Sequence, residues 1–122
     1  MYLFINLNLY CFIIAPSAAP VSLSGMNLTS TNLSISWEPP PIDDQNGIIL
    51  GYNVTYTPDN GVSKDTTTND TMIVINDLLI YTDYNVSVAA HTSVGTGPFD
   101  SIVVRTDSSG IKTKMSIIHQ CC

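Results

Sequence analysis

Apolar and polar side chains alternate with a period of two, not 3.6, between residues 20 and 106. In the clearest run, serines separate Leu33, Ile35 and Trp37. Such alternation is typical of a strand with one buried face and one solvated face. The pattern predicts seven short strands in all. The other runs are at residues 21–23, 52–56, 64–68, 73–76, 84–90 and 102–105.

Turn-forming residues separate these runs. The three prolines at residues 39–41 cannot continue a hydrogen-bonded ladder, so they are predicted to end the strand that contains Trp37. Asn-Gly pairs at residues 46–47 and 60–61 are typical turn dipeptides. Two glycines and a proline within residues 95–98 are predicted to break the chain before the last strand. Short strands with regular turns and no helical stripe favour an all-β fold, a sandwich of two antiparallel sheets.

Spaced motifs within these strands resemble the fibronectin type III family. The sequence Ser-Trp-Glu-Pro-Pro at residues 36–40 and the stretch 46–56 look like strands B and C of that family. Residues 78–84 match its Leu-x-Pro-x-Thr-x-Tyr element, except that Ile80 stands in place of the proline. Residues 88–97 are similar to strand F and the loop that follows it. The likeness extends to repeats of neural adhesion molecules and receptor tyrosine phosphatases.

The resemblance implies a seven-stranded antiparallel immunoglobulin-like β-sandwich of fibronectin type III type at residues 20–107. It implies that Trp37 lies between the two sheets against Tyr52 and Tyr84. Tyr84 is expected to form a tyrosine corner, in which its hydroxyl bonds to the backbone near Leu78. The predicted structural core comprises Leu33, Ile35, Trp37, Tyr52, Val54, Tyr56, Ile75, Leu78, Tyr84, Val86 and Val88.

The charge balance narrows the choice of partner. The chain has 122 residues, which suits one domain, and its four Lys and Arg against ten Asp and Glu give a net charge of −6. A nucleic acid or an anionic membrane would require a basic surface, so neither is an expected partner. Only 11% of the residues are charged, so the surface must obtain its polarity from Ser, Thr and Asn.

The two ends differ from the predicted domain. The first 15 residues are uncharged and apolar apart from Asn6 and Asn8, and they precede small residues, so residues 1–19 are predicted to be a signal peptide. This stretch is too short for a transmembrane span. We therefore expect a secreted or extracellular chain; without a signal peptide, the alternative is an intracellular scaffold module. Residues 108–122 are predicted to be a disordered tail, with palmitoylation or an intermolecular disulfide left open at Cys121 and Cys122.

Five Asn-x-Ser/Thr sequences without a central proline are candidate N-glycosylation sites. The phase of the predicted strands points Asn53 and Asn85 out of the sheet. Asn27 and Asn69 fall near strand ends, where they should be accessible. A chain that enters a eukaryotic secretory pathway is thus expected to be a glycoprotein. The five candidate asparagines are Asn27, Asn32, Asn53, Asn69 and Asn85.

No catalytic, cofactor or metal site is predicted. His91 and Ser93 lie close in sequence, but no orienting carboxylate accompanies them. Asp43 and Asp44 are too few for a calcium site, which needs six to eight oxygen ligands. We therefore expect a protein that is not an enzyme and takes neither a cofactor nor a small-molecule substrate.

The resemblance implies a non-catalytic adhesion or protein-interaction module with an unidentified protein partner, and a chain that is a fragment of a larger cell-surface receptor. The alternative is a passive structural spacer. The two differ in surface, since a binding module should expose a contiguous apolar patch and a spacer should not. Phe99 follows a Gly-Pro pair and is the candidate partner contact, unless it packs across the end of the sandwich.

Overall fold

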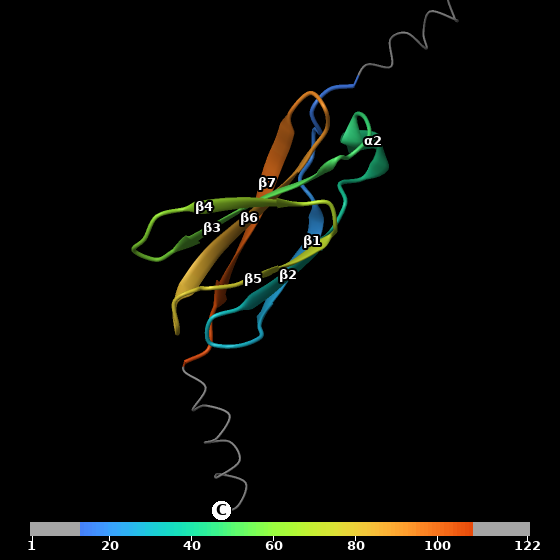
Figure 1. Ribbon diagram of the computed structural model, residues 1–122. Helices are drawn as coiled ribbons and strands as arrows, with labels where there is room; N and C mark the ends of the chain where they lie inside the picture. The colour runs from blue at the N-terminus through green and yellow to red at the C-terminus, as the bar shows by residue number, and fades with distance from the viewer. Residues whose placement is uncertain (1–12, 109–122) are drawn as a thin grey trace, which may run out of the picture.

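The computed structural model describes residues 13–108, in which seven strands form two antiparallel sheets packed face to face (Figure 1). One sheet has the order β1-β2-β5 and the other β4-β3-β6-β7. This architecture confirms the all-β sandwich that the alternating pattern predicts. The strands are β1 (Val21–Asn27), β2 (Leu33–Glu38), β3 (Gly51–Pro58), β4 (Lys64–Thr68), β5 (Met72–Ile75), β6 (Asp83–His91) and β7 (Thr96–Arg105).

The core lies between the two sheets and follows from the period-two phase. Trp37 of β2 meets Tyr52 of β3 edge-on, with ring centroids 5.3 Å apart. This offset geometry suits two aromatic quadrupoles. The structure buries every predicted core residue except Tyr56, which packs half-buried against the others. The buried set is Leu33, Ile35, Trp37, Tyr52, Val54, Ile75, Leu78, Tyr84, Val86, Val88 and Ala90.

A tyrosine corner lies at the loop that connects β5 in one sheet to β6 in the other. The backbone N–H of Leu79 donates to the hydroxyl of Tyr84 at 2.9 Å, as the resemblance implies. Beside it, the hydroxyl of buried Thr106 donates to the carbonyl of Leu79 at 2.7 Å and accepts from the N–H of Thr82 at 2.9 Å. The backbone between β5 and β6 is irregular and makes no ladder hydrogen bonds. These bonds instead satisfy its polar groups.

The last strand begins earlier than the sequence predicts. The glycines and proline of residues 95–98 are predicted to break the chain, but β7 starts at Thr96 and runs through Gly97 and Pro98. The pairs Ala89↔Phe99 and His91↔Thr96 leave an extra residue on β7, which marks a β-bulge. A bulge tolerates proline because that position makes no ladder hydrogen bond.

A single helical turn, α2 (Ile42–Gln45), lies in the loop between β2 and β3. The Asn-Gly pair at residues 46–47 predicts only a turn in this loop and not the helix. The turn ends at Asn46, which adopts the left-handed conformation (φ 59°, ψ 28°) that asparagine tolerates at a helix C-terminus. Among residues 13–108 no helix is long and apolar enough to cross a membrane.

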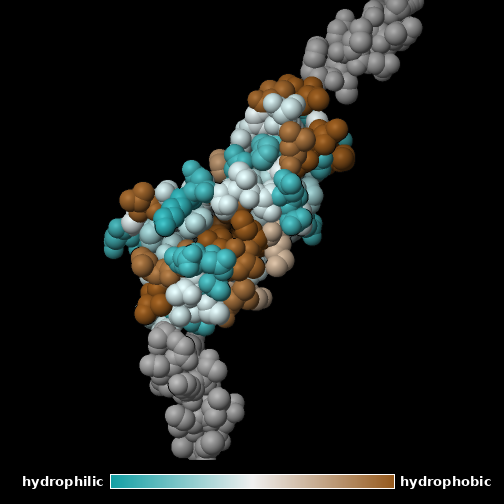
Figure 2. Space-filling view, in the orientation of Figure 1, coloured by the Kyte–Doolittle hydropathy of each residue, from teal (hydrophilic) through white to brown (hydrophobic). Residues whose placement is uncertain are grey.

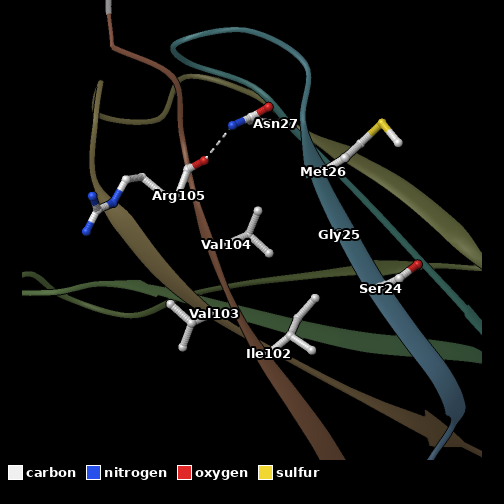
Figure 3. A pocket seen from close by; sticks show the side chains of 8 residues that line it. All are labelled: Ser24, Gly25, Met26, Asn27, Ile102, Val103, Val104 and Arg105. Atoms are coloured by element: carbon white, nitrogen blue, oxygen red, sulfur yellow. Dashed lines mark hydrogen bonds between the residues drawn. The ribbon is translucent and has the colours of Figure 1, made fainter.

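The edge strands β1 and β7 lie side by side at one open side of the sandwich (Figure 3). They belong to different sheets and form no ladder with each other. The side-chain amide of Asn27 bridges them by donating to the carbonyl of Arg105 at 3.1 Å (Figure 3). This contact occupies one of the free backbone groups that make sheet edges prone to pairing with other chains.

Candidate interaction surface

A short N-terminal segment crosses the end of the sandwich that carries α2. We call residues 13–17 the N-terminal strap. The N–H of Ile14 donates to the carbonyl of Asn46 at 2.9 Å, and the side-chain amide of Asn46 donates to the carbonyl of Ala15 at 3.0 Å. The hydroxyl of buried Thr92 donates to the carbonyl of Ile14 at 2.8 Å. The strap therefore ties the β2–β3 loop to the β6–β7 loop.

A second set of contacts fixes the other half of the strap. The backbone N–H of Ser17 donates to the carbonyl of Asp44 at 2.8 Å, and its hydroxyl donates to the Asp44 carboxylate at 3.0 Å. Pro16 is buried, and a Cβ at Gly97 would lie 2.7 Å from its carbonyl oxygen. Glycine at residue 97 thus allows the strap to approach β7 closely.

Exposed branched aliphatic side chains gather around the strap and the two loops. Figure 2 shows hydrophobic surface at the end of the molecule that carries α2. Ile42 and Ile48 are the most exposed, at 77% and 73%. A group of exposed apolar side chains of this kind is typical of a contact surface. The loop-end patch consists of Ile13, Ile14, Ile42, Ile48 and Val94.

A second exposed apolar group, the far-end patch, lies beyond the β3–β4 turn and along the β5–β6 loop. It consists of Val62, Leu79, Ile80 and Tyr81. Val62 and Leu79 line a pocket of about 270 Å³ together with Tyr56 and Tyr84. Each end of the sandwich therefore exposes a group of apolar side chains, which suits a module that contacts neighbours.

An ion pair lies next to the far-end patch. The Arg105 guanidinium donates two hydrogen bonds to the Asp83 carboxylate, from Nε at 2.6 Å and from Nη2 at 3.0 Å. Its central carbon also lies 4.9 Å from the ring centroid of Tyr81, in cation–π range. Hydrogen bonding to Arg105 lowers the pKa of Asp83 and raises that of Arg105, since each charge favours the other. The pair is solvent-exposed, so its contribution to stability is small.

The five candidate glycosylation sites are distributed over both sheets and the loops. Asn53 and Asn85 lie on the outer face of the four-stranded sheet, where Asn85 is exposed and Asn53 partly so. Asn69 is exposed in the β4–β5 turn. Asn27 is exposed at the end of β1, and Asn32 is partly buried just before β2. Asn27, Asn69 and Asn85 are thus accessible to solvent.

Phe99 lies in β7 on the outer face of the four-stranded sheet, and 48% of it is exposed. It pairs with Ala89 rather than lying in the loop that precedes β7. The candidate contact is therefore separated from the loop-end patch. No sequence signal could have placed it so, because the bulge that sets its register depends on pairing with β6.

The side chains considered for catalysis or metal binding do not come together in one site. Within residues 13–108 no group of three or more His, Cys, Asp and Glu is placed to hold a metal ion. Asp44, one of the two loop carboxylates, accepts hydrogen bonds from Ser17 of the strap. The predicted signal peptide and tail fall largely on residues 1–12 and 109–122, outside the described residues. Residues 13–19, the described part of the predicted signal peptide, contact the domain through the strap.

Comparison with known proteins gives the class of this chain. The family model of the fibronectin type III domain matches residues 18–106. Together with the sandwich and its tyrosine corner, this shows that the chain belongs to the fibronectin type III family.

The matching relatives are much longer proteins. The chain is 38% identical over 95 residues to tyrosine-protein phosphatase Lar of Drosophila melanogaster, covering 75% of this chain and 5% of that one. It is 34% identical over 103 residues to protein sidekick-2 of Mus musculus, covering 80% and 5%. A fibronectin type III domain of human contactin 1 superposes with a TM-score of 0.70 at 25% identity, covering 79% and 82%. The chain is thus a module like those of adhesion molecules and receptor phosphatases.

Proposed function

We propose that this chain is a non-catalytic, extracellular protein-interaction module that binds a protein partner through the loop-end patch. The observation that carries the proposal is the β2–β3 loop, whose exposed Ile42 and Ile48 remain after removal of the predicted signal peptide. The side-chain amide of Gln45 donates to the carbonyl of Pro40 at 2.9 Å, and the N–H of Leu50 donates to the carbonyl of His91 at 2.9 Å, so the loop is held without the strap. Loops fixed before binding lose little conformational entropy when a partner docks. Ile42 and Ile48 would supply the apolar centre of the contact, and Asp43 would supply part of its polar rim.

The extracellular assignment is supported by the predicted signal peptide, the five N-glycosylation sequences and the kinds of protein that match. Phosphatase Lar and sidekick-2 contain regions similar to this chain, which spans 5% of each. A module from such a protein would act beside other domains. We accordingly propose that the chain corresponds to part of a larger cell-surface receptor.

The second candidate is a passive spacer. The far-end patch favours it, because a spacer in a row of domains would bury apolar surface at both of its ends. Such contacts between domains are usually modest in area and more polar than obligate interfaces. The two candidates therefore differ in whether the loop-end patch binds a separate molecule.

Secretion is tested first. The full chain with a C-terminal tag is expressed in animal cells, and cells and medium are compared by blot with and without a glycan-removing enzyme. A glycan-sensitive band in the medium is the expected result. An unglycosylated band confined to the cytosol would contradict the extracellular assignment and favour an intracellular scaffold module.

Binding is tested with the secreted chain clustered on fluorescent beads and added to cultured animal cells. Clustering makes a weak contact measurable because several copies bind together. Ile42→Asp with Ile48→Asp should reduce bead binding about tenfold or more, since a hot-spot centre is lost. Val62→Asp at the far-end patch is the matched control, equally exposed, and should change little. No bead binding, or equal loss in both variants, would favour the spacer.

A further inference from the structure

Three residues on neighbouring strands form one row across the outer face of the four-stranded sheet. Asn53 of β3 is paired with Ala89 of β6, which is paired with Phe99 of β7. Adjacent strands are about 4.8 Å apart, so the backbones of Asn53 and Phe99 are about 10 Å apart. The small side chain of Ala89 lies between them.

The row borders a shallow depression in the protein surface. Asn53 and Phe99 line it together with Thr55 and residues 65–67, and its volume is about 240 Å³. That is below the roughly 300–1,000 Å³ of sites for drug-sized ligands and suits a single sugar ring. Ala89 is completely buried although it lies outside the core between the sheets. Neighbouring side chains on the outer face therefore already cover it.

The side-chain amide of Asn53 is directed toward β7. Its nitrogen donates to the hydroxyl of Thr96, the first residue of β7, at 3.1 Å. Asn53 begins an Asn-Val-Thr sequence, and the nitrogen that makes this bond is the atom that an N-linked glycan would modify. A glycosylated amide keeps one N–H, so the bond to Thr96 can persist while the sugar extends along the sheet.

We propose that Asn53 carries an N-linked glycan whose first N-acetylglucosamine occupies this depression and packs against the ring of Phe99. A sugar ring has an apolar face of C–H groups, and the negative face of an aromatic ring attracts such positively polarised groups. The glycan would cover an otherwise exposed aromatic residue on a sheet that has few charges. Phe99 would then be a platform for the chain's own glycan and not a contact for a separate protein.

The covalent step is an ordinary glycosyl transfer to the nascent chain. The amide nitrogen of Asn53 forms a bond to the anomeric carbon of N-acetylglucosamine. The bond from that carbon to the diphosphate of a lipid-linked oligosaccharide breaks, and the lipid diphosphate leaves while the amide loses one proton. No oxidant or reductant is involved.

Asn85 on the same face provides an internal control. It is exposed, begins an Asn-Val-Ser sequence and pairs with Val103 of β7, which is 66% exposed. Valine lacks a flat π face, so a glycan on Asn85 should gain no comparable contact with β7. Phe99 with Asn53, and Val103 with Asn85, therefore form two pairs on one face, and only the first contains an aromatic ring; Val103 lies on the strand next to Asn85, whereas β6 separates Asn53 from Phe99.

The inference rests on the proposed extracellular function, and its test separates the two. The full chain is secreted from animal cells, and glycopeptide mass spectrometry measures occupancy at each sequence. Failure of the chain to reach the medium would overturn both proposals. Occupancy at Asn69 or Asn85 with Asn53 empty would overturn only this inference. We expect Asn53 to be occupied.

The contact itself is tested by thermal unfolding in a double-variant cycle. Phe99→Ala should lower the Tm by about 3–6 °C more in the glycosylated chain than in the Asn53→Gln chain. Trimming the glycan to one N-acetylglucosamine should preserve this difference. Val103→Ala should cost the same with and without Asn85→Gln. Equal costs of Phe99→Ala in both backgrounds would overturn the proposal.

A spectroscopic measurement complements the cycle. In the trimmed glycoprotein, ring currents of Phe99 should shift proton resonances of the Asn53-linked N-acetylglucosamine upfield, with cross-relaxation between sugar and ring protons. The Asn85-linked sugar should resemble a free glycopeptide. Resonances of the Asn53-linked sugar that stay unchanged in Phe99→Ala would contradict packing on the ring.

Discussion

Gly25 of β1 and Val104 of β7 approach so closely that a Cβ at Gly25 would lie 2.6 Å from Cγ2 of Val104. The two strands belong to different sheets, so this contact closes one side of the sandwich. The same Cβ would lie 2.9 Å from Cδ1 of Ile35. Glycine is therefore needed at residue 25 for lack of space, not for an unusual backbone angle.

Gly25→Val should destabilise the domain by about 1–3 kcal/mol, because the added carbons must displace packed side chains. Urea unfolding followed by tryptophan fluorescence measures the change in the free energy of unfolding. Ser24→Val is the control, since Ser24 is exposed on the outer face and loses only a bond to Ser36. Equal effects of the two substitutions would contradict the packing explanation.

Trp37→Ala should cost about 3–5 kcal/mol, because it removes the largest side chain of the core and its edge-on contact with Tyr52. The loss is large relative to the total stability of a small domain, so secretion should fall sharply. Trp37→Phe retains an aromatic ring and should cost less. The indole nitrogen of Trp37 has no hydrogen-bond partner, so no bond is lost there. A small effect of Trp37→Ala would contradict the central position of this residue.

Tyr84→Phe should cost about 1–1.5 kcal/mol, since it removes the hydroxyl that accepts from the N–H of Leu79 and leaves the ring in place. Chemical denaturation provides the measurement. Tyr81→Phe, which removes an exposed hydroxyl that accepts from Arg105 at 3.3 Å, should change stability little. The contrast would assign the cost to the tyrosine corner.

In a chain that retains residues 13–17, Thr92→Val should lower the Tm by several degrees, because it deletes the bond that holds the carbonyl of Ile14. The same substitution in a chain that begins at Ala18 should have a smaller effect, since the strap is then absent. The difference between the two backgrounds measures how far the strap stabilises the loops. Identical effects would show that Thr92 acts without the strap.

Stability should decrease in acid partly through Asp83. Hydrogen bonding to Arg105 lowers the pKa of Asp83 in the folded chain, so the folded state binds this proton less readily than the unfolded state. The stabilisation is present above the unfolded pKa of about 3.9 and is lost as the pH falls through the lower folded value. Asp83→Asn should flatten this part of the pH profile of unfolding. An unchanged profile would show that other carboxylates dominate.

Tyr52 is expected to affect the stability of the domain at alkaline pH. Burial raises its pKa, since the core disfavours the phenolate. Its contribution is full below the unfolded pKa of about 10 and is lost as the pH rises toward the folded value. Tyr52→Phe should therefore reduce the loss of stability at alkaline pH. Unfolding measured between about pH 9 and 11.5, on either side of the tyrosine pKa of about 10, tests this.

The sequence alone determined the strands, the phase of the core and the family. Period-two alternation assigns each side chain to a face because a strand turns its residues to opposite sides, whatever its partners. The phase of Leu33, Ile35 and Trp37 could thus be predicted locally, and so could the outward phase of Asn53 and Asn85. The turn residues between the strands are equally local signals.

Tertiary structure decided what depends on contacts between segments far apart in the chain. Pro98 could enter β7 only because pairing with β6 placed a bulge at that point. The strap holds its position through Asn46 and Thr92, which lie about 30 and 80 residues beyond it, and periodicity carries no trace of such bonds. The row that brings Asn53 near Phe99 likewise exists only once three strands are in register, because register is a property of the sheet and not of any one strand.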